Sequence, residues 1–115
     1  MEKAKKIEKP WGYELIWAHT ERYAGKILVI EKGKRLSYQY HEKKEETFFL
    51  LEGAIRLEFS ENGGVRQIKN LKPGDFFHVP PQLRHRIEAV ENSRVLEVSS
   101  PELGDVVRLE DDYNR

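Results

Sequence analysis

The sequence predicts an all-β protein, and three observations support that prediction. Short apolar stretches recur along the chain, and several are rich in β-branched or aromatic residues. Glycine and proline clusters separate these stretches. Before residue 101, no long segment has the 3.6-residue apolar spacing of an amphipathic helix. About eight to ten short strands joined by frequent turns are typical of a sandwich, a jelly roll or a barrel.

The first strands follow from apolar content. Residues 13–18 form an apolar stretch, and residues 26–30 are β-branched and end at a Lys-Gly turn at 32–33. Residues 47–51 are almost continuously apolar, which indicates a strand buried on both faces. Residues 54–59 alternate with period two, so their apolar side chains share one face and their charged side chains the other.

Turn residues place the remaining strands. Asn62-Gly63-Gly64 predicts a tight hairpin into residues 65–68, because its central positions tolerate positive φ. Further turns are predicted at residues 72–74 and 80–81, and a later strand at residues 94–98.

The length of 115 residues is enough for one modest core, so residues 1–115 are expected to form a single domain. Residues 1–9, rich in Lys and Glu, are expected to be a flexible arm or an added edge strand. Residues 10–100 are expected to form the β-barrel and residues 101–115 a C-terminal tail. Only residues 105–115 could carry a helical turn.

Composition excludes several classes of function. Lys plus Arg and Asp plus Glu each total 20, so the formal net charge is zero and nothing favours nucleic acid as a partner. There is no cysteine, which excludes disulfides and thiolate ligands. The amino terminus has no apolar leader, and the longest clear apolar run, residues 48–51, is too short to span a membrane. A cytoplasmic protein without membrane contact is expected.

Four polar residues have the spacing of one metal site. Gln39 and His41 lie two apart, so in a strand both project to the same side. Glu46 follows a short turn and begins the next strand, which is expected to run antiparallel to the first. His85 follows the Pro-Pro bend at the start of a later strand. Taken singly, each is more often a solvated or hydrogen-bonded residue, but the joint spacing favours a metal centre.

The four side chains would suit one divalent cation. Amide, imidazole and carboxylate ligands fit Zn²⁺, which is the first choice, while Mn²⁺, Fe²⁺, Co²⁺ or Ni²⁺ could use the same set.

These blocks resemble the two motifs of the cupin family. The first family motif is Gly, five residues, His-x-His, three or four residues, Glu, six residues, Gly; the chain has Gly33, Gln39-Tyr40-His41, Glu46 and Gly53 at that spacing. The second is Gly, five residues, Pro-x-Gly, two residues, His, three residues, Asn; the chain has Gly74, Pro80-Pro81-Gln82, His85 and Ala89. Gln39, Gln82 and Ala89 depart from the family residues. The resemblance implies a cupin jelly-roll barrel.

Within the cupins, the chain resembles the cupins of type II mannose-6-phosphate isomerases. Residues 35–41 read Arg-Leu-Ser-Tyr-Gln-Tyr-His, which resembles that group's Arg-Leu-Ser-x-Gln-x-His. Pro-Trp-Gly at 10–12, Glu-Arg-Tyr at 21–23 and the tail 103–115 also resemble the group. The resemblance implies metal-dependent conversion of mannose 6-phosphate to fructose 6-phosphate. Residues 42–46 depart from the group's His-His-Arg-Ala-Glu, which leaves the substrate open.

Larger members of that group carry a nucleotide-sugar pyrophosphorylase domain, for which 115 residues leave no room, so guanylyltransferase activity is not expected here.

An isomerase needs an acid–base group that reaches two neighbouring carbons. Glu97 is the first candidate, because its apolar neighbours should face the other way; the alternative is a solvent-facing Glu at a sheet edge. Lys44 is the second candidate, although an exposed turn lysine is the more common situation. Arg108 lies in the family-like tail, and the resemblance favours a catalytic or pocket role for it.

A phosphorylated sugar would also need cationic donors, since guanidinium groups match phosphate oxygens. Arg35 and Arg84, besides Arg108, are the candidates, and His78 could line the pocket. A homodimer is expected, with the aromatic-rich stretch from Trp11 to Trp17 as the interface. Three other functions remain open, namely a non-catalytic metal-containing sugar-binding cupin, a different cupin metalloenzyme such as an Fe dioxygenase, and a purely structural role without bound metal.

Overall fold

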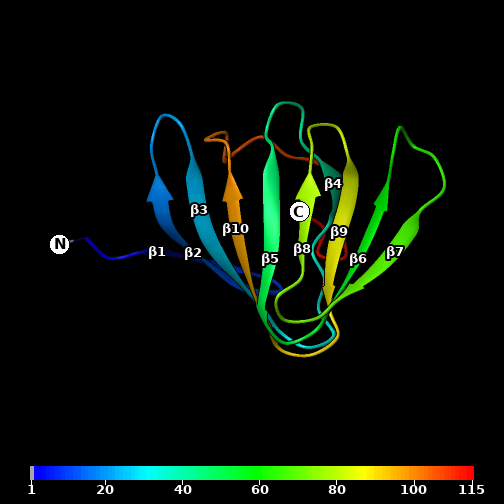
Figure 1. Ribbon diagram of the computed structural model, residues 1–115, viewed down its shortest axis with the longest axis horizontal. Helices are drawn as coiled ribbons and strands as arrows, with labels where there is room; N and C mark the ends of the chain where they lie inside the picture. The colour runs from blue at the N-terminus through cyan, green and yellow to red at the C-terminus, as the bar shows by residue number, and fades with distance from the viewer. Residues whose placement is uncertain (1) are drawn as a thin grey trace.

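A computed structural model describes residues 2–115, which form eleven strands and no helix. The strands build two antiparallel sheets that face each other as a jelly-roll barrel (Figure 1). The large sheet has the order β1 (Lys5–Lys9), β2 (Gly12–His19), β3 (Ala24–Ile30), β10 (Ser93–Ser99), β5 (Glu46–Glu52), β8 (Phe76–Val79). The small sheet has the order β11 (Val107–Glu110), β4 (Tyr38–Tyr40), β9 (Arg84–Ala89), β6 (Ile55–Ser60), β7 (Gln67–Leu71). The predicted all-β jelly-roll fold is therefore confirmed.

Alternation along the strands builds the core between the sheets. On β6, Ile55, Leu57 and Phe59 point inward and are buried, whereas Arg56 is exposed. Facing strands contribute Leu50 and Val95 to the same apolar cluster. The core fills much of the barrel, so polar residues that point inward must gather in the remaining space.

The turns follow the residue types that the sequence provides. Asn62 and Gly63 have φ values of 49° and 72°, as the predicted hairpin between β6 and β7 requires. Gly53 has φ of +97°, and a Cβ at this position would lie 2.3 Å from the Ser93 hydroxyl. Both features make glycine necessary where β5 turns into β6.

Both ends of the described chain extend the sheets. Strand β1 pairs with β2 along the edge of the large sheet, so the N-terminal segment is an edge strand. The expected helical turn within residues 105–115 is wrong, because Val107–Glu110 forms β11 and pairs with β4. This pairing satisfies backbone groups that would otherwise be left open at the edge of β4. Within residues 2–115, no helix is of a length and apolarity that would cross a membrane.

Candidate metal centre

The four predicted ligands come from both sheets at one end of the barrel. Gln39 on β4 lies directly opposite His85 on β9, so both side chains belong to one face of the small sheet. His41 lies just beyond β4, in the loop that leads to β5. Glu46 is the first residue of β5, which belongs to the other sheet and is not paired with β4. The carboxylate therefore reaches the ligands from across the barrel.

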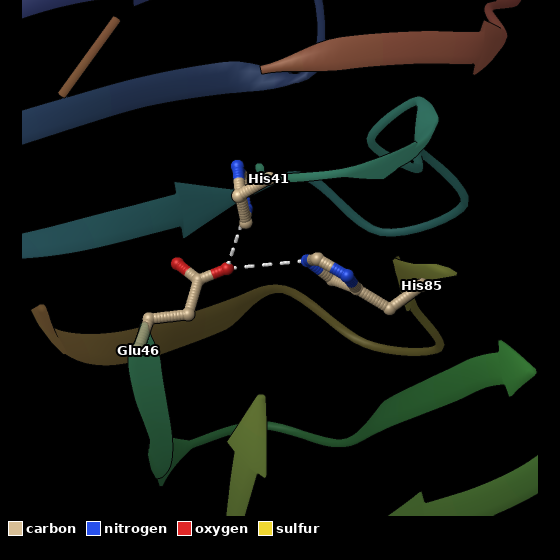
Figure 2. Close-up of side chains that lie close together, drawn as sticks. All are labelled: His41, Glu46 and His85. Carbon is tan, nitrogen blue, oxygen red and sulfur yellow. Dashed lines mark hydrogen bonds and ion pairs between the residues drawn. The ribbon is translucent and has the colours of Figure 1, made fainter. Parts of the chain in front are cut away.

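Three of the ligands meet around one oxygen atom. Glu46 Oε1 lies 2.8 Å from His41 Nε2 and 3.2 Å from His85 Nε2 (Figure 2). The donor atoms of the three residues all lie within 4.8 Å of one another, and all three side chains are buried. This trio has the separations that a single bound cation requires.

Hydrogen bonds on the far side of each imidazole define its protonation. His41 Nδ1 lies 2.5 Å from the carbonyl of Asp105, and His85 Nδ1 lies 2.8 Å from the carbonyl of Leu83. A carbonyl only accepts, so each Nδ1 carries the proton, and in a neutral imidazole Nε2 then carries a lone pair. Two lone pairs would face a carboxylate in a dry site, and His85 Nε2 has no hydrogen-bond partner among the described residues. A cation between them resolves this repulsion, so the trio can hold a metal ion.

Gln39 lies beside this trio. It lines the same cavity as His41, and its Oε1 accepts a hydrogen bond of 2.7 Å from the Ser37 hydroxyl. Its position opposite His85 is compatible with the predicted fourth ligand role.

The C-terminal tail fixes the ligand loop. The Asp105 carboxylate accepts hydrogen bonds from the backbone N–H groups of Glu42, Lys43 and Lys44, at 3.0, 2.7 and 2.9 Å. These three bonds lower the pKa of Asp105. Because the carbonyl of the same residue binds His41, one tail residue orients both the loop and a ligand.

A chain of alternating charges runs from the trio into the cavity. Lys44 Nζ lies 3.3 Å from Glu46 Oε2 and 3.2 Å from Glu97 Oε2. Lys26 Nζ lies 3.7 Å from the same oxygen of Glu97 and 3.2 Å from Glu14 Oε2. We refer to these five residues as the buried charge network.

Burial and neighbouring charges set the ionisation of the network. Burial, followed by the charge of Glu46, raises the pKa of Glu97 to about 7. Burial works against the charged form of Lys44, but the two carboxylates beside it raise the pKa of its ammonium group. Burial also works against ionisation of Glu46. Without a metal ion, Nε2–H groups of His41 and His85 that donate to this carboxylate, together with the charge of Lys44, hold its pKa well below its usual range.

The network opens into a cavity of about 260 Å³. Seven of its lining residues are charged: Lys9, Glu14, Lys26, Lys44, Glu97, Arg108 and Arg115. Five of these are cations and two are carboxylates, so the cavity favours an anionic ligand. Gln39 and His41 lie on its wall, which connects it to the metal centre.

The predicted catalytic residues all reach this cavity. Glu97 points inward from β10 and is buried, while Leu96 and Val98 point the other way. Lys44 is also buried, at 3% exposure, rather than being an exposed turn lysine. Arg108 lines the cavity from β11, opposite Gln39. Their catalytic roles stay predictions.

The three predicted substrate-binding residues lie elsewhere. Arg35 binds Asp112 in the tail, with 2.7 Å between Nε and Oδ2. The Arg84 guanidinium lies 6.0 Å from the Tyr40 ring, and His78 Nε2 lies 2.5 Å from the Glu45 carboxylate, with both side chains of that pair exposed. None of the three lines the cavity, so its geometry gives them no part in binding a ligand there.

Four of the charged residues that line the cavity were not predicted from the sequence as site residues: Lys9, Glu14, Lys26 and Arg115. Lys26 lies directly opposite Glu97 on the neighbouring strand. Its place in the cavity could therefore be predicted only once the pairing of β3 with β10 was known. Arg115 lies in the family-like tail, but its position in the cavity depends on how the tail folds back.

Comparison with known proteins agrees with this architecture. The family model described as a cupin domain matches residues 26–99, which is more than half of the chain. The chain belongs to the cupin family. This cupin is 31% identical to mannose-1-phosphate guanylyltransferase ManC of Salmonella typhimurium over 117 residues. The match covers 96% of the chain but 23% of that relative, so the chain spans about a quarter of the relative's length.

Solved cupin structures share the fold. KdgF from Halomonas sp. has a TM-score of 0.74 and 25% identity, with 87% of this chain and 88% of that one covered. Oxalate decarboxylase from Bacillus subtilis has a TM-score of 0.80 at 18% identity, with 92% of this chain and 30% of that one covered. That decarboxylase has Mn(II) centres. Metal binding thus occurs on this fold, and the cluster of His41, Glu46 and His85 could hold a metal in this cupin.

Proposed function

We propose that this cupin is a metal-dependent aldose–ketose isomerase that acts on a phosphorylated sugar, with mannose 6-phosphate to fructose 6-phosphate as the first candidate reaction. One observation carries the proposal, namely the buried Lys44–Glu97 pair that joins the trio to a cationic cavity. Similarity to ManC, named for a mannose phosphate substrate, supports the same class of sugar.

The proposed metal ligands are Gln39, His41, Glu46 and His85. Nitrogen and oxygen donors of this kind suit a divalent ion, with Zn²⁺ first and Mn²⁺, Fe²⁺, Co²⁺ or Ni²⁺ as the other candidates. When bound, such an ion polarises the sugar carbonyl as a Lewis acid.

The chain's own residues would move the protons. The Glu97 carboxylate would remove the proton from C2 of the open-chain aldose and deliver it to C1 of the enediol. In the same sequence the hydroxyl proton on O2 would leave and O1 would gain one, so the ketose has the same atoms as the aldose. Lys44, with its ammonium group 3.2 Å from Glu97, would hold that carboxylate in place and donate to the developing oxyanion.

A coupled assay of ketose phosphate formation tests the proposal. The protein is stripped, reloaded with each candidate metal, checked by elemental analysis and assayed with mannose 6-phosphate and other aldose phosphates. Turnover that depends on metal supports the proposal, and a metal-loaded protein that converts none of these sugars contradicts it. Saturable sugar binding without product would instead identify a non-catalytic binding protein, and oxygen uptake with Fe²⁺ would identify a dioxygenase.

A further inference from the structure

We propose that Arg108, Arg115 and Lys9 form an anion subsite at the mouth of the cavity, and that this subsite binds the phosphate monoester of the substrate. The inference rests on the proposed function, since it names the part of the substrate that the rim of the same cavity would hold. All three residues line the cavity, and all three are half-buried or exposed, whereas Lys44 and Glu97 deeper inside are buried.

The charges of the inner cavity are already paired. Lys26 lies between Glu14 and Glu97, and Lys44 lies between Glu97 and Glu46. These two lysines are therefore balanced by carboxylates of the buried charge network.

The rim has an excess of positive charge. Within residues 2–115, neither Arg108 nor Lys9 forms an ion pair with a carboxylate, and Arg115 pairs with Asp111, at 3.0 Å between Nε and Oδ2. Three cations thus share one carboxylate, and a doubly charged anion would balance them.

Strand register sets the distance between this rim and the metal centre. Arg108 lies directly opposite Gln39, and Gln39 lies directly opposite His85, so the three side chains form one row across β11, β4 and β9. Opposite Cβ atoms are about 4.5–5.5 Å apart, which places Arg108 about 10 Å from His85 at the Cβ atoms. Lys9 belongs to β1 of the other sheet. A ligand could therefore present one end to the trio and its anionic end to the rim.

The chemistry of the rim favours phosphate. A guanidinium group offers two parallel N–H donors that match two phosphate oxygens, and a nearby ammonium group adds a point charge. Neutral sugars lack the anion that would engage these donors.

Binding of inorganic phosphate to the metal-loaded protein, measured by ³¹P NMR or calorimetry, tests the subsite without any need for turnover. Arg108→Gln and Lys9→Gln should each weaken phosphate binding about tenfold. Arg94→Gln is the matched control, because Arg94 pairs with Glu52 outside the cavity. If the protein isomerises sugars, the same two variants should raise KM for the phosphosugar while leaving the metal content unchanged.

The outcomes separate the two proposals. Phosphate binding that both variants weaken would support the subsite even in a protein without isomerase activity. Phosphate binding that is undetectable, or equally strong in Arg108→Gln, Lys9→Gln and the wild type, would overturn the subsite and leave an observed isomerase activity standing.

A different observation carries a second inference, that two copies of this chain associate through the outer surface of the large sheet. Leu15, Ile27, Leu96, Phe49 and Phe76 lie directly opposite one another on β2, β3, β10, β5 and β8. These residues alternate with inward residues such as Leu28 and Phe48, so their side chains form one apolar row across five strands on the outside of the barrel. We call this row, with Trp17, Leu51 and Val98 beside it, the outer apolar face.

The border of the outer apolar face is exposed, while Leu15, Ile27 and Leu96 in its central row are half-buried. Trp17 is 52% exposed, Leu51 is 49% exposed and Phe76 is 71% exposed. Trp11 cannot belong to the interface expected from the sequence, because it is buried in the core at 3% exposure. The proposed dimer interface is therefore the outer side of the large sheet and not the stretch from Trp11 to Trp17, of which Trp17 lies at one border.

A second copy is the occupant that this face fits. Five strands about 4.8 Å apart and three rows of outward side chains give a surface about 20–25 Å across in each direction, or about 400–600 Å². This area is below the about 800 Å² per partner of a standard interface but reaches the about 500 Å² per partner that a specific interface needs. The Arg94–Glu52 pair at its border is already neutralised, so two copies can meet face to face without repulsion.

Sedimentation at micromolar concentration tests this inference. The wild type should be a dimer, and Phe49→Glu should make it a monomer that still binds metal. Val65→Glu is the control, because Val65 is 86% exposed in the β6–β7 hairpin, away from the face. A monomeric wild type, or a dimer that persists in both Phe49→Glu and Phe76→Glu, would overturn the inference.

Discussion

The ammonium group of Lys44 lies 3.2 Å from the carboxylate of Glu97, although 53 positions separate the two residues in the chain. The same ammonium group lies 3.3 Å from Glu46, so one lysine connects the candidate metal centre to the candidate acid–base group. The position of Lys44 between Glu46 and Glu97 predicts how substitutions in the buried charge network change activity and stability.

Replacing Glu97 by Gln should lower kcat for the isomerisation about a hundredfold or more, because the amide cannot take up the C2 proton. The amide can still accept from Lys44, so the fold and the metal content should remain. Steady-state kinetics with elemental analysis measure both effects. Glu52→Gln, at the exposed C-terminal end of β5, is the control and should leave kcat unchanged. A Glu97→Gln enzyme with near wild-type kcat would assign the proton transfer to another group.

Replacing Lys44 by Met should destabilise the protein by about 3–5 kcal/mol, because the buried Glu46 loses its lysine and the buried Glu97 keeps only Lys26, 3.7 Å away. Urea unfolding of the metal-free protein measures the change. Adding Glu97→Gln to this variant removes one of the uncompensated charges, so the double variant should be more stable than Lys44→Met alone. If the two substitutions destabilise additively, the buried pair is not energetically coupled.

A bound divalent ion should raise the melting temperature, because the ion binds the folded trio and not the unfolded chain. At a free metal concentration of about 100 times Kd, the stabilisation should be about 2.7 kcal/mol. His41→Ala and His85→Ala should abolish this shift. His78→Ala should keep it, because His78 pairs with Glu45 outside the cavity. Equal metal-dependent shifts in all three variants would exclude the trio as the binding site.

Acid should loosen the tail before the barrel unfolds. A hydrogen bond from Arg35 lowers the pKa of Asp112, and one from Arg66 lowers the pKa of Glu110. Because the folded-state pKa values are depressed, their contribution to stability is fully present above the unfolded values of about 4 and is lost as pH falls through the folded ones.

Hydrogen exchange of the β11 amides measures this loosening. Their protection should decrease as pH is lowered below about 4, after correction for intrinsic rates. Asp112→Asn should already reduce protection at neutral pH. Protection that stays constant in acid would show that these ion pairs do not hold the tail.

Much of the architecture follows from local sequence. Period-two alternation identified β6, and the Asn-Gly pair identified the turn after it. Local spacing also placed Gln39 and His41 on adjacent positions of one wall, and it placed Glu97 inside the barrel. These features depend on the side to which a strand residue points, which alternation determines.

The pairing of strands could not be predicted from the sequence in the same way, because it depends on contacts between distant segments. Glu46 was correctly expected to begin the next strand along the chain, but the sequence did not indicate that this strand, β5, belongs to the facing sheet. Lys44 is buried because two carboxylates from distant segments surround it, and nothing in its own segment indicates this. Arg35 was expected at the ligand site, but its partner is Asp112, which the tail brings to it.

The most direct test of the proposed isomerase is the incubation of the metal-loaded protein with mannose 6-phosphate in D₂O, followed by NMR of the sugar protons. A base that moves the C2 proton through an enediol lets that proton exchange with solvent. We expect fructose 6-phosphate to appear with deuterium at the transferred position, and we expect both signals to vanish in Glu97→Gln. A sample with confirmed metal that forms no ketose and incorporates no deuterium would contradict the account.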